Sequence, residues 1–542
     1  MRLQMVVSAF PALLSLGLAD PAAARQAPRP PQAVPVSEDL RTPAERSEFT
    51  EHTPYDSMWA FLRRLEADAP EMRLASYGTS GEGRELPYAV FARPSVSEPA
   101  EARALGKPIL VLAAGVHGDE RTLRESVLLI TRELATEGTS LHRALDAVTI
   151  LVVPQLNPDG FAAEPGPIRE NASGVDLNRD YMKLEHPEIR SYVQNILHGW
   201  DPHLFVDGHD GGAFPYNLHY QCPSHAGSDA RITSLCDDRI FPAVGAKLAA
   251  EGYRAWYYQR GTETRWEVGD PDARIGRNYG GLVNLVGILF ESPPSQTGTE
   301  AVLSGVLAYE AVVEWAQGNA DLLVRTVEEA RLETVRLGAP EGDVPIEMTY
   351  APEPARVRYL IGAGQDLRGI VEVESDSLMK RPIATLVRPR PWAYVLPPEA
   401  VEAVELLTAH GIEVERLTGA ADATVSAYPM LGISHEPAYD HPAAVRLQVA
   451  DAVPREVALP AGSFVVRTAQ VQGRLAALLL EPETMDGVVY WNRMDDLLPV
   501  GEIEAAALAS GGGAPATPAP LFPIYKLMAP TELATEPLTQ TR

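Results

Sequence analysis

The chain has 542 residues, which is too long for one ordinary domain and predicts at least two hydrophobic cores. Hydrophobic residues make up 45% and charged residues 22%, a balance typical of globular, soluble proteins. The net charge of -27 argues against nucleic acids and anionic membranes as partners, because both are polyanions.

The first 24 residues have the pattern of a secretory signal peptide. Arg2 supplies a positive charge, residues 3–19 are mostly apolar, and residues 22–24 are small alanines suited to cleavage. A membrane anchor is the alternative, but Pro11 disfavours a stable spanning helix. We therefore expect a secreted or periplasmic protein without a stable membrane span after signal cleavage.

A Pro-rich spacer at residues 25–40 leads into a region, residues 41–337, in which strand-like and helix-like segments alternate. Short apolar strands between helices predict an α/β fold with a largely buried sheet. The expected strands are residues 108–114, 148–153, 204–206 and 282–290, and the expected helices are residues 121–135, 187–197 and 300–333, the last as one helix or two.

A second region, residues 344–508, is richer in short strands and predicts a smaller α+β accessory domain. Its clearest segments are a strand at 392–396, a helix at 398–410, a strand at 413–417 and a strand at 463–468. A flexible linker is expected at 509–520. Apolar residues return in the tail, residues 521–542, which suggests that it docks back.

Cysteine usage limits the kind of metal site that the chain can build. Cys222 and Cys236 are the only cysteines, and the sequence leaves open whether they pair or stay free. Two cysteines cannot form a thiolate zinc cage, so any metal site must use histidine and carboxylate ligands.

The most informative segment is residues 115–120, which lies between an expected buried strand and an expected helix. His117 and Glu120 lie three residues apart at this turn and can point at one ion, and zinc accepts imidazole and carboxylate together. The alternative is a surface histidine beside an acidic residue that favours the helix N-terminus.

Two polar segments follow. Residues 157–160, with the sequence NPDG, are a turn signature. Residues 174–179, with the sequence GVDLNR, contain Asn178 next to Arg179. The side-chain N–H groups of such a pair can bind a carboxylate through hydrogen bonds. An ordinary structural salt bridge is the alternative interpretation of this pair.

Two later strands end in chemically active side chains. His209 ends an apolar strand at the sheet edge expected for His117, whereas His203 precedes that strand and His219 lies beyond a loop. Glu291 ends another apolar strand, and a partly buried glutamate can act as a general base because burial raises its pKa.

The order of these motifs resembles that of the zinc carboxypeptidase family, the carboxypeptidase A-type metallopeptidases, in its bacterial exported form. Residues 55–70 are similar to the family's first helix, and residues 78–84, with the sequence GTSGEGR, to a conserved turn of it. The likeness covers roughly residues 50–320 and implies a mixed, mostly parallel sheet with helices on both faces.

The resemblance also implies a role for each motif residue. The chain would be a zinc-dependent carboxypeptidase that hydrolyses C-terminal peptide bonds through a zinc-bound water, and its substrates would be peptides with a free C-terminal carboxylate. The implied roles are one Zn²⁺ held by His117, Glu120 and His209, with His117 oriented by Asp176, the terminal carboxylate held by Asn178 and Arg179, the scissile carbonyl polarised by Arg169, and Glu291 as the general base.

The resemblance leaves substrate contacts open. Tyr279 is the expected counterpart of the family's mobile active-site tyrosine, with Tyr257 and Tyr258 as alternatives. Arg274 and Arg277 lie near the stretch that reads the substrate side chain, which hints at acidic residues, although both could be surface arginines on an acidic protein.

Other functions compete with this interpretation. An N-acyl amino acid deacylase of related fold would share the H-x-x-E motif, the D-x-N-R motif and the distal His and Glu. Cell-wall peptides are another possible substrate. A non-catalytic binding protein would be expected to have lost a ligand or the base, and the chain has kept all of them.

Overall fold

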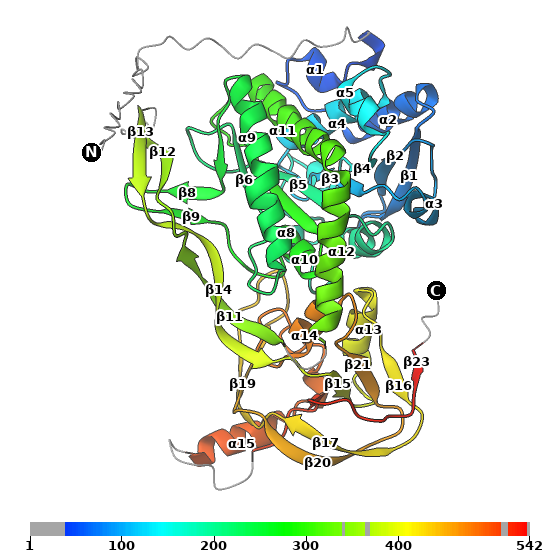
Figure 1. Cartoon of the computed structure of the whole chain (residues 1–542), viewed down its shortest axis with the longest axis vertical. Coiled ribbons are helices and arrows are strands. Elements are labelled where there is room, and N and C mark those ends of the chain that lie inside the picture. Colours follow the sequence, from blue (N-terminus) through cyan, green and yellow to red (C-terminus); the bar gives the residue numbers. More distant parts are fainter. Residues whose placement is uncertain (1–37, 339–341, 364–368, 511–518, 539–542) are drawn as a thin grey trace, which may run out of the picture.

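Figure 1 shows the computed structural model of the chain, which describes residues 38–338, 342–363, 369–510 and 519–538. The expected signal peptide, most of the Pro-rich spacer and most of the expected linker lie outside these residues. Within the described ranges, no helix is both long and apolar enough to cross a membrane.

An eight-stranded mixed sheet organises the upper part of the molecule in Figure 1, with the strand order β1-β2-β4-β3-β5-β10-β6-β7. Its central strands β4, β3, β5 and β10 run parallel to one another, and antiparallel strands flank them. The strands are β1 (Met72–Thr79), β2 (Glu85–Phe91), β3 (Ile109–Ala114), β4 (Thr149–Val153), β5 (Leu204–His209), β6 (Leu218–Gln221), β7 (Ala255–Tyr257) and β10 (Val286–Glu291).

Both faces of this sheet are buried. Along β3, Val111 belongs to one hydrophobic cluster and Leu112 to the other, because successive side chains of a strand point to opposite faces. The helices of this part are α1 (Pro43–Arg46), α2 (Tyr55–Asp68), α3 (Pro99–Ala104), α4 (Thr122–Ala135), α5 (Ser140–Ala144), α6 (Pro158–Phe161), α7 (Pro187–Ser191), η3 (Tyr192–His198), α8 (Ala230–Leu235), η4 (Cys236–Ile240), α9 (Phe241–Ala250), α10 (Gly276–Leu282), α11 (Gly298–Gly318) and α12 (Ala320–Arg336). The expected α/β fold is confirmed.

One expected element differs in detail, and for another the structure decides between two alternatives. The strand expected at 282–290 begins only at Val286, because α10 ends at Leu282 and Asn284 takes a left-handed backbone conformation with φ of 61°. The helical stretch at 300–333 consists of two helices, which Asn319 separates.

The two cysteines form a disulfide between Cys222, after β6, and Cys236, at the start of η4. The question that the sequence left open is therefore settled for this structure, and no thiol remains free.

The C-terminal region begins with a long two-stranded arm. The arm consists of β11 (Asp343–Pro352) and β14 (Leu378–Pro389), with the hairpin β12 (Val357–Ala363) and β13 (Gly369–Ser375) at its far end. In Figure 1 the arm rises from the lower part of the molecule towards β8 and β9. Strand β14 pairs with β9 (Trp266–Val268), which pairs with β8 (Gln259–Gly261), so the arm joins the N-terminal half through a shared sheet.

The rest of the C-terminal region is built on a seven-stranded sheet with the order β20-β17-β22-β15-β21-β16-β23. Strands β22 and β23 come from the tail, so the expectation that the tail docks back is confirmed. The elements are β15 (Ala393–Leu396), α13 (Val401–Ala409), β16 (Glu415–Leu417), β17 (Ala421–Ala427), β18 (Met430–His435), β19 (Val445–Val449), β20 (Val453–Leu459), β21 (Phe464–Arg467), α14 (Gly473–Leu480), η5 (Asp495–Leu497), α15 (Val500–Ser510), β22 (Tyr525–Leu527) and β23 (Thr535–Pro537).

Candidate metal centre and active site

Three neighbouring strands end at the candidate site. The parallel register places Glu291 at the end of β10 opposite His209 at the end of β5, and Ala114 at the end of β3 opposite Gly208. The turn after β3 carries His117 and Glu120. Register alone therefore brings the sequence motifs to one edge of the sheet, where α/β folds place their sites.

Asp210 ties the two ligand-bearing segments together. Its carboxylate accepts hydrogen bonds from the backbone N–H groups of Thr122 and Leu123, at 2.7 and 3.2 Å, and so caps the start of α4. Because α4 follows Glu120 directly, this cap fixes the turn of His117 and Glu120 against the end of β5. Burial raises the pKa of Asp210 to about 6.

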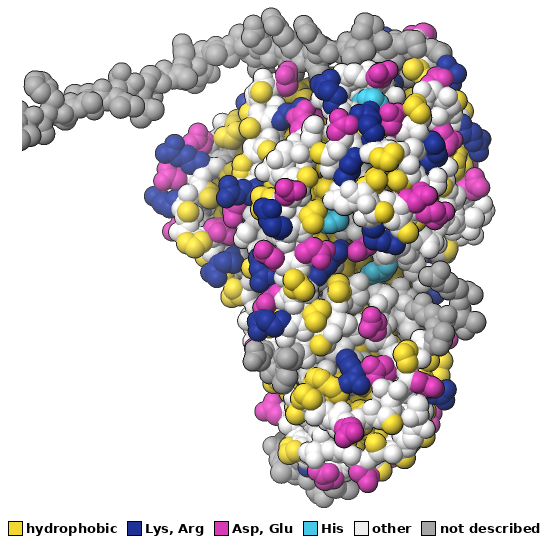
Figure 2. All heavy atoms as spheres, turned by 45° about the vertical axis from the view of Figure 1, so that its right-hand side comes forward, with side chains coloured by type: hydrophobic (Ala, Val, Ile, Leu, Met, Phe, Trp, Pro, Cys, Tyr) yellow, Lys and Arg dark blue, Asp and Glu magenta, His cyan; other side chains and the backbone are white. Residues whose placement is uncertain are grey.

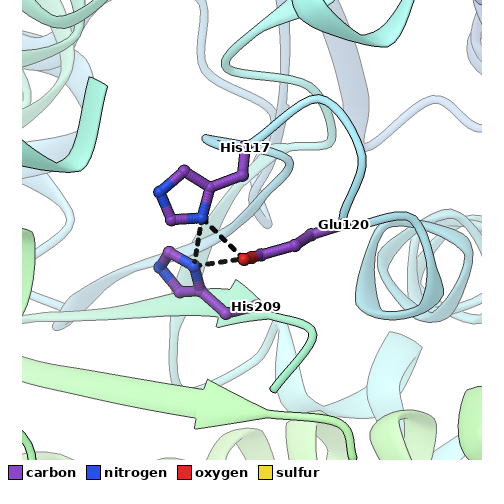
Figure 3. A group of neighbouring side chains, drawn as sticks. All are labelled: His117, Glu120 and His209. Carbon is purple, nitrogen blue, oxygen red and sulfur yellow. Dashed lines mark hydrogen bonds and ion pairs between the residues drawn. The ribbon is translucent and has the colours of Figure 1, made fainter. Parts of the chain in front are cut away.

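Figure 3 shows His117, Glu120 and His209 pointing at one another. The two Nδ1 atoms lie 3.2 Å apart, and the Glu120 carboxylate oxygens lie 2.8 Å from each of them. Zinc–ligand bonds of about 2.0–2.1 Å in a tetrahedron give ligand–ligand separations of roughly 3.3 Å. The three atoms are therefore spaced as the ligands of one small cation would be.

Carboxylates hold the far nitrogen of each imidazole. Nε2 of His117 lies 3.0 Å from Asp176, and Nε2 of His209 lies 3.0 Å from Asp207. These contacts favour the proton on Nε2 and leave the Nδ1 lone pairs facing each other and Glu120. Facing lone pairs repel unless a cation lies between them, so the donor set fits zinc.

The imidazoles and carboxylates of the site shift one another's pKa values. Burial alone would lower the pKa of His117 and of His209, but the carboxylates around them raise both above the usual range, for His209 by a wide margin. Burial would raise the pKa of Glu120, but the two imidazoles hold it well below its ordinary value.

The structure places the expected substrate-binding residues around this centre. The Arg169 guanidinium lies 3.0 Å from Glu120 and 2.9 Å from Asp176. Asn178 accepts the backbone N–H of Gly276 at 2.9 Å, and Arg179 donates to the Asn178 backbone carbonyl at 3.0 Å. Asn178 is thus held by α10, whereas most donors of Arg179 remain available to a ligand.

Glu291 lies on the same cavity and is 6% exposed. Burial raises the pKa of its carboxyl to about 8, against the opposing effect of the nearby imidazoles. Gly211 permits this position, because a Cβ there would lie 2.4 Å from a Glu291 oxygen. A carboxyl of raised pKa beside a metal centre has the properties of a general base.

The prediction that Tyr279 contacts substrate is wrong for this structure. Tyr279 is fully buried in α10, and its hydroxyl bonds to His198 at 2.9 Å and to His410 at 3.0 Å. Tyr258 lines the cavity instead. The sequence could not distinguish them, because His410, which holds Tyr279 in the core, comes from the C-terminal region.

Arg274 and Arg277 also differ in their position relative to the cavity. Arg274 pairs with Asp486 at 2.9 Å and packs on Tyr490 and Trp491, all in the C-terminal region. Arg277 lies on the cavity wall and is 3% exposed. Neither is the surface arginine that the sequence allowed as an alternative.

Asp207 is the site residue that the sequence analysis missed. It lies two residues before His209 on β5, and residues two apart on a strand share a face. The alternation within FVDGH therefore contained a signal that the carboxylate would lie beside the imidazole.

A second cluster of possible ligands, Asp180, Glu185 and His186, is already neutralised. Lys183 lies 3.0 Å from Asp180, and the Glu185 carboxylate pairs with His441 and Arg493. The charges of Asp180 and Glu185 are thus compensated by cationic side chains of the protein.

Comparisons with known proteins agree with this geometry. Residues 58–203 match a family model described as zinc carboxypeptidase. The chain is 26% identical to "Carboxypeptidase 2" of Trichophyton equinum over 464 residues, which is 80% of this chain and 82% of that protein. It is 31% identical to the human "Carboxypeptidase N catalytic chain" over 263 residues, which is 40% of this chain and 54% of that protein.

A solved structure of a putative carboxypeptidase A from Shewanella denitrificans superposes with a TM-score of 0.40 and 21% identity, covering 50% of this chain and 70% of that one. The family model covers the turn of His117 and Glu120 and the D-x-N-R segment, and ends before His209 and Glu291. Residues 58–203 thus match the zinc carboxypeptidase family, and the curated relatives that resemble most of this chain are named carboxypeptidases.

Proposed function

We propose that the protein is a zinc-dependent carboxypeptidase that releases single residues from the C-terminus of peptides. The observation that carries the proposal is the trio of His117, Glu120 and His209, whose donor atoms meet at 2.8–3.2 Å beside a buried glutamate. We propose the region of residues 41–337 as the catalytic domain, and secretion or periplasmic export through residues 1–24.

Each residue of the site has a chemical part in this proposal. Zinc, when bound, supplies a Lewis acid that polarises the scissile carbonyl and makes a water acidic near neutral pH. Glu291 accepts the proton of the attacking water and passes it to the departing amine. Arg169 borders the same centre and donates hydrogen bonds to the carbonyl oxygen as negative charge develops on it.

Arg179 is the proposed anchor for the terminal carboxylate. Its side chain is 28% exposed and lies 3.8 Å from Asp176, and within the described part of the chain its one other contact is a hydrogen bond to the Asn178 carbonyl. A guanidinium with free donors beside the metal centre suits a carboxylate, which it can bind through two parallel hydrogen bonds. Asn178, which also lines the cavity, completes this anchor in the proposal.

Matched peptides with free and amidated C-termini test the proposal by mass spectrometry. We expect single-residue release from free termini and a rate lower by about tens- to thousands-fold for amidated ones, because the amide leaves Arg179 unpaired. Arg179→Ala should remove most of this preference while zinc stays bound. Equal cleavage of both peptides, or cleavage within the chain, would exclude a carboxypeptidase.

The substitution Glu291→Gln tests the role of the general base independently of zinc binding. The substitution keeps the shape of the side chain and removes its capacity to accept a proton. We expect full zinc content with turnover reduced by about 10²- to 10⁴-fold. Near-normal turnover in this variant would place the general base elsewhere.

A further inference from the structure

A second cavity lies where the two halves of the chain meet. This junction cavity has a volume of about 210 Å³, and its wall includes Leu282 at the end of α10, Val344 on β11 and Leu478 on α14. Among the described residues, none lines both the junction cavity and the cavity of the metal centre. The junction cavity is therefore separate from the candidate active site.

Arg390, which follows β14, is a buried cation on the wall of the junction cavity. It is 3% exposed, and within the described ranges it forms no ion pair. Its Nη2 donates to the carbonyls of Thr334, in the last turn of α12, and of Thr468, at 3.2 and 2.6 Å. Those bonds cap the end of α12 but use one of the three nitrogens. Nε is buried without a partner, and Nη1 has no acceptor in the described part of the chain.

The other charged groups of the wall do not neutralise Arg390. Arg474 is itself a cation and pairs with Asp229 at 2.8 Å. Asp343, the one carboxylate on the wall among the described residues, is exposed and lies within ion-pair distance of neither arginine. A buried guanidinium without a counter-ion is costly, so such a group is expected where a ligand supplies the negative charge.

His225 adds a second unsatisfied donor to the same wall. Its Nδ1 accepts the backbone N–H of Gly227 at 2.9 Å, which leaves the ring proton on Nε2. The side chain is 3% exposed, and the structure gives Nε2 no acceptor among the residues that it describes. Burial lowers the pKa of His225 to about 4, so the imidazole is neutral at physiological pH. Because both unsatisfied groups are donors, the ligand that fits must offer acceptors.

The rest of the wall is largely apolar. Its side chains include Leu282, Leu337, Val344, Pro345 and Leu478. An apolar cavity of about 150 Å³ can hold benzene, so the junction cavity has room for a small ring or a short alkyl chain together with a carboxylate. Apolar walls with a few polar groups, at the junction of two parts of a chain, are typical of sites for small ligands.

We propose that the junction cavity binds a small monocarboxylate with an apolar body, about the size of benzoate or hexanoate. Arg390 binds the carboxylate, as a guanidinium can through two parallel hydrogen bonds, and His225 supplies a further donor. The apolar body packs against the side chains of both halves. This inference goes beyond the proposed function and does not depend on it, because the site lies outside the catalytic cavity.

Calorimetric titrations of the full-length, zinc-loaded protein with benzoate and benzamide, and with hexanoate and hexanamide, test the proposal. We expect each carboxylate to bind about 10- to 100-fold more tightly than its amide, the size of a charge-assisted hydrogen bond. Inorganic phosphate, which has no apolar body, should bind more weakly than either carboxylate. Equal affinity for acid and amide, tighter binding of phosphate, or no binding of the carboxylates would overturn the proposal.

The metal centre can also bind carboxylates, so variants must separate the two sites. Arg390→Gln should remove the preference for the acid, whereas Arg179→Ala should leave it. Arg388→Gln is the matched control, because Arg388 lies two residues earlier, on β14, and pairs with Glu483 outside the junction cavity. Binding that is lost in Arg179→Ala and kept in Arg390→Gln would place the ligand at the metal centre. Equal loss in Arg388→Gln would also contradict the role of Arg390.

A second variant keeps the proposal testable if Arg390→Gln fails to fold. Ala226 is partly buried on the wall of the junction cavity, and Ala226→Leu should fill part of its volume and weaken the binding of hexanoate at least tenfold. On the unmodified protein, hexanoate should raise the Tm more than hexanamide does, because a ligand that binds only the folded chain stabilises it. Unchanged affinity in Ala226→Leu, or equal Tm shifts from acid and amide, would overturn the proposal. A failure to hydrolyse any peptide would contradict the proposed function and leave this inference standing.

Discussion

Asp207 lies 3.0 Å from Nε2 of His209, and Asp176 lies 3.0 Å from Nε2 of His117. A carboxylate in this position fixes the tautomer of the imidazole and makes its other nitrogen a better metal ligand. Both carboxylates are buried, at 1% and 4% exposure, so their charge acts on the ring with little screening by water. The second of them was predicted from the sequence and the first was not.

We expect Asp207→Asn to weaken zinc binding by about 10- to 100-fold while the protein stays folded. The amide has the size of the carboxylate but no charge, so it holds the Nε2 proton of His209 less firmly. Competition with a chromophoric chelator measures the affinity. Glu291→Gln serves as the control, because it also replaces a buried carboxyl of the cavity with an amide but removes no contact to a ligand imidazole. Equal zinc affinity in the two variants would contradict the role assigned to Asp207.

The same carboxylates make zinc binding depend on pH. In the metal-free protein, burial lowers the pKa of both imidazoles, but Glu120 and Asp176 raise that of His117, and Asp207 and Glu120 raise that of His209, above the usual range. A proton on Nδ1 occupies the lone pair that the metal needs, so protons and zinc compete. The affinity should therefore fall as the pH falls, and the fall should begin above the pKa of an ordinary histidine, about 6.5.

Zinc titrations between pH 5 and about 9 would measure this dependence. The affinity should rise with pH and level off only above the pKa of an ordinary histidine. An affinity that is already constant from about pH 6.5 upwards would show that the imidazoles bind protons no more tightly than free histidines do.

At the scale of elements, the turn that carries His117 is packed against a second motif. A Cβ on Gly118 would lie 2.1 Å from the backbone carbonyl carbon of Gly160, in the NPDG turn. The backbone N–H of Gly118 also donates to the carbonyl of Arg169 at 3.3 Å. The turn of His117 thus meets the later segment of residues 160–169 with no room for a side chain, and this contact sets where His117 points.

Gly118→Ala should displace this turn. Because the obstructing atoms belong to the backbone, the turn must move, and we expect a loss of about 1–3 kcal/mol in the free energy of unfolding together with weaker zinc binding. Gly166→Ala is the matched control in the neighbouring loop, since a Cβ there meets no atom within 4 Å. Thermal unfolding and zinc content are the measurements. Unchanged values for Gly118→Ala would show that the turn adapts to the extra atom.

The sequence predicted those features of the site that depend on strand order and strand ends. His209 and Glu291 end apolar strands, and the register of β5 and β10 places them side by side. Periodicity could not predict which tyrosine faces the cavity, because Tyr279 is held by His410, 131 residues further along the chain. The same holds for Arg274, whose partner Asp486 lies in the C-terminal region.

The arm of the C-terminal region also contacts the wall of the cavity. Tyr350 on β11 donates its hydroxyl to the carbonyl of Gly269 at 2.7 Å, and Gly269 lines the cavity. Gln221 bonds to both the N–H and the carbonyl of the same glycine, at 2.9 Å each. The cavity wall is thus supported from the central sheet on one side and from the C-terminal region on the other.

At the scale of the whole molecule, one hydrophobic core runs through both halves of the chain. The cluster that covers one face of the central sheet includes Phe205 and Leu282, and continues into Val344, Leu407 and Leu478 of the C-terminal region. On the face shown in Figure 2, acidic and basic side chains are interspersed and hydrophobic ones are scattered. The two halves therefore share the hydrophobic cluster on one face of the central sheet, whereas the cluster on the other face lies within the N-terminal half.

Polar contacts reinforce this shared core. Tyr279 bonds to His410, Arg474 on α14 pairs with Asp229 at 2.8 Å, and Asn284 donates to the carbonyl of Val471 at 3.1 Å. Asp229 precedes α8, and Asn284 precedes β10, which ends in Glu291. The C-terminal region is therefore fastened close to one of the strands that form the site. This arrangement differs from a domain that hangs on a flexible linker.

A chain that ends after residue 338 should therefore fail to fold stably. Its truncation uncovers the face of the sheet beneath Leu407 and Leu478, and each large apolar side chain that loses its cover costs about 1.5–3 kcal/mol. A few such losses are comparable to the whole stability of a typical domain, roughly 5–15 kcal/mol. We expect the truncated chain to aggregate or to bind hydrophobic dyes, and the full chain to unfold in a single calorimetric transition. Size-exclusion chromatography, dye binding and zinc content compare the two chains directly. A soluble, zinc-loaded and fully active fragment, or two separate transitions in the full chain, would show that the halves are independent domains.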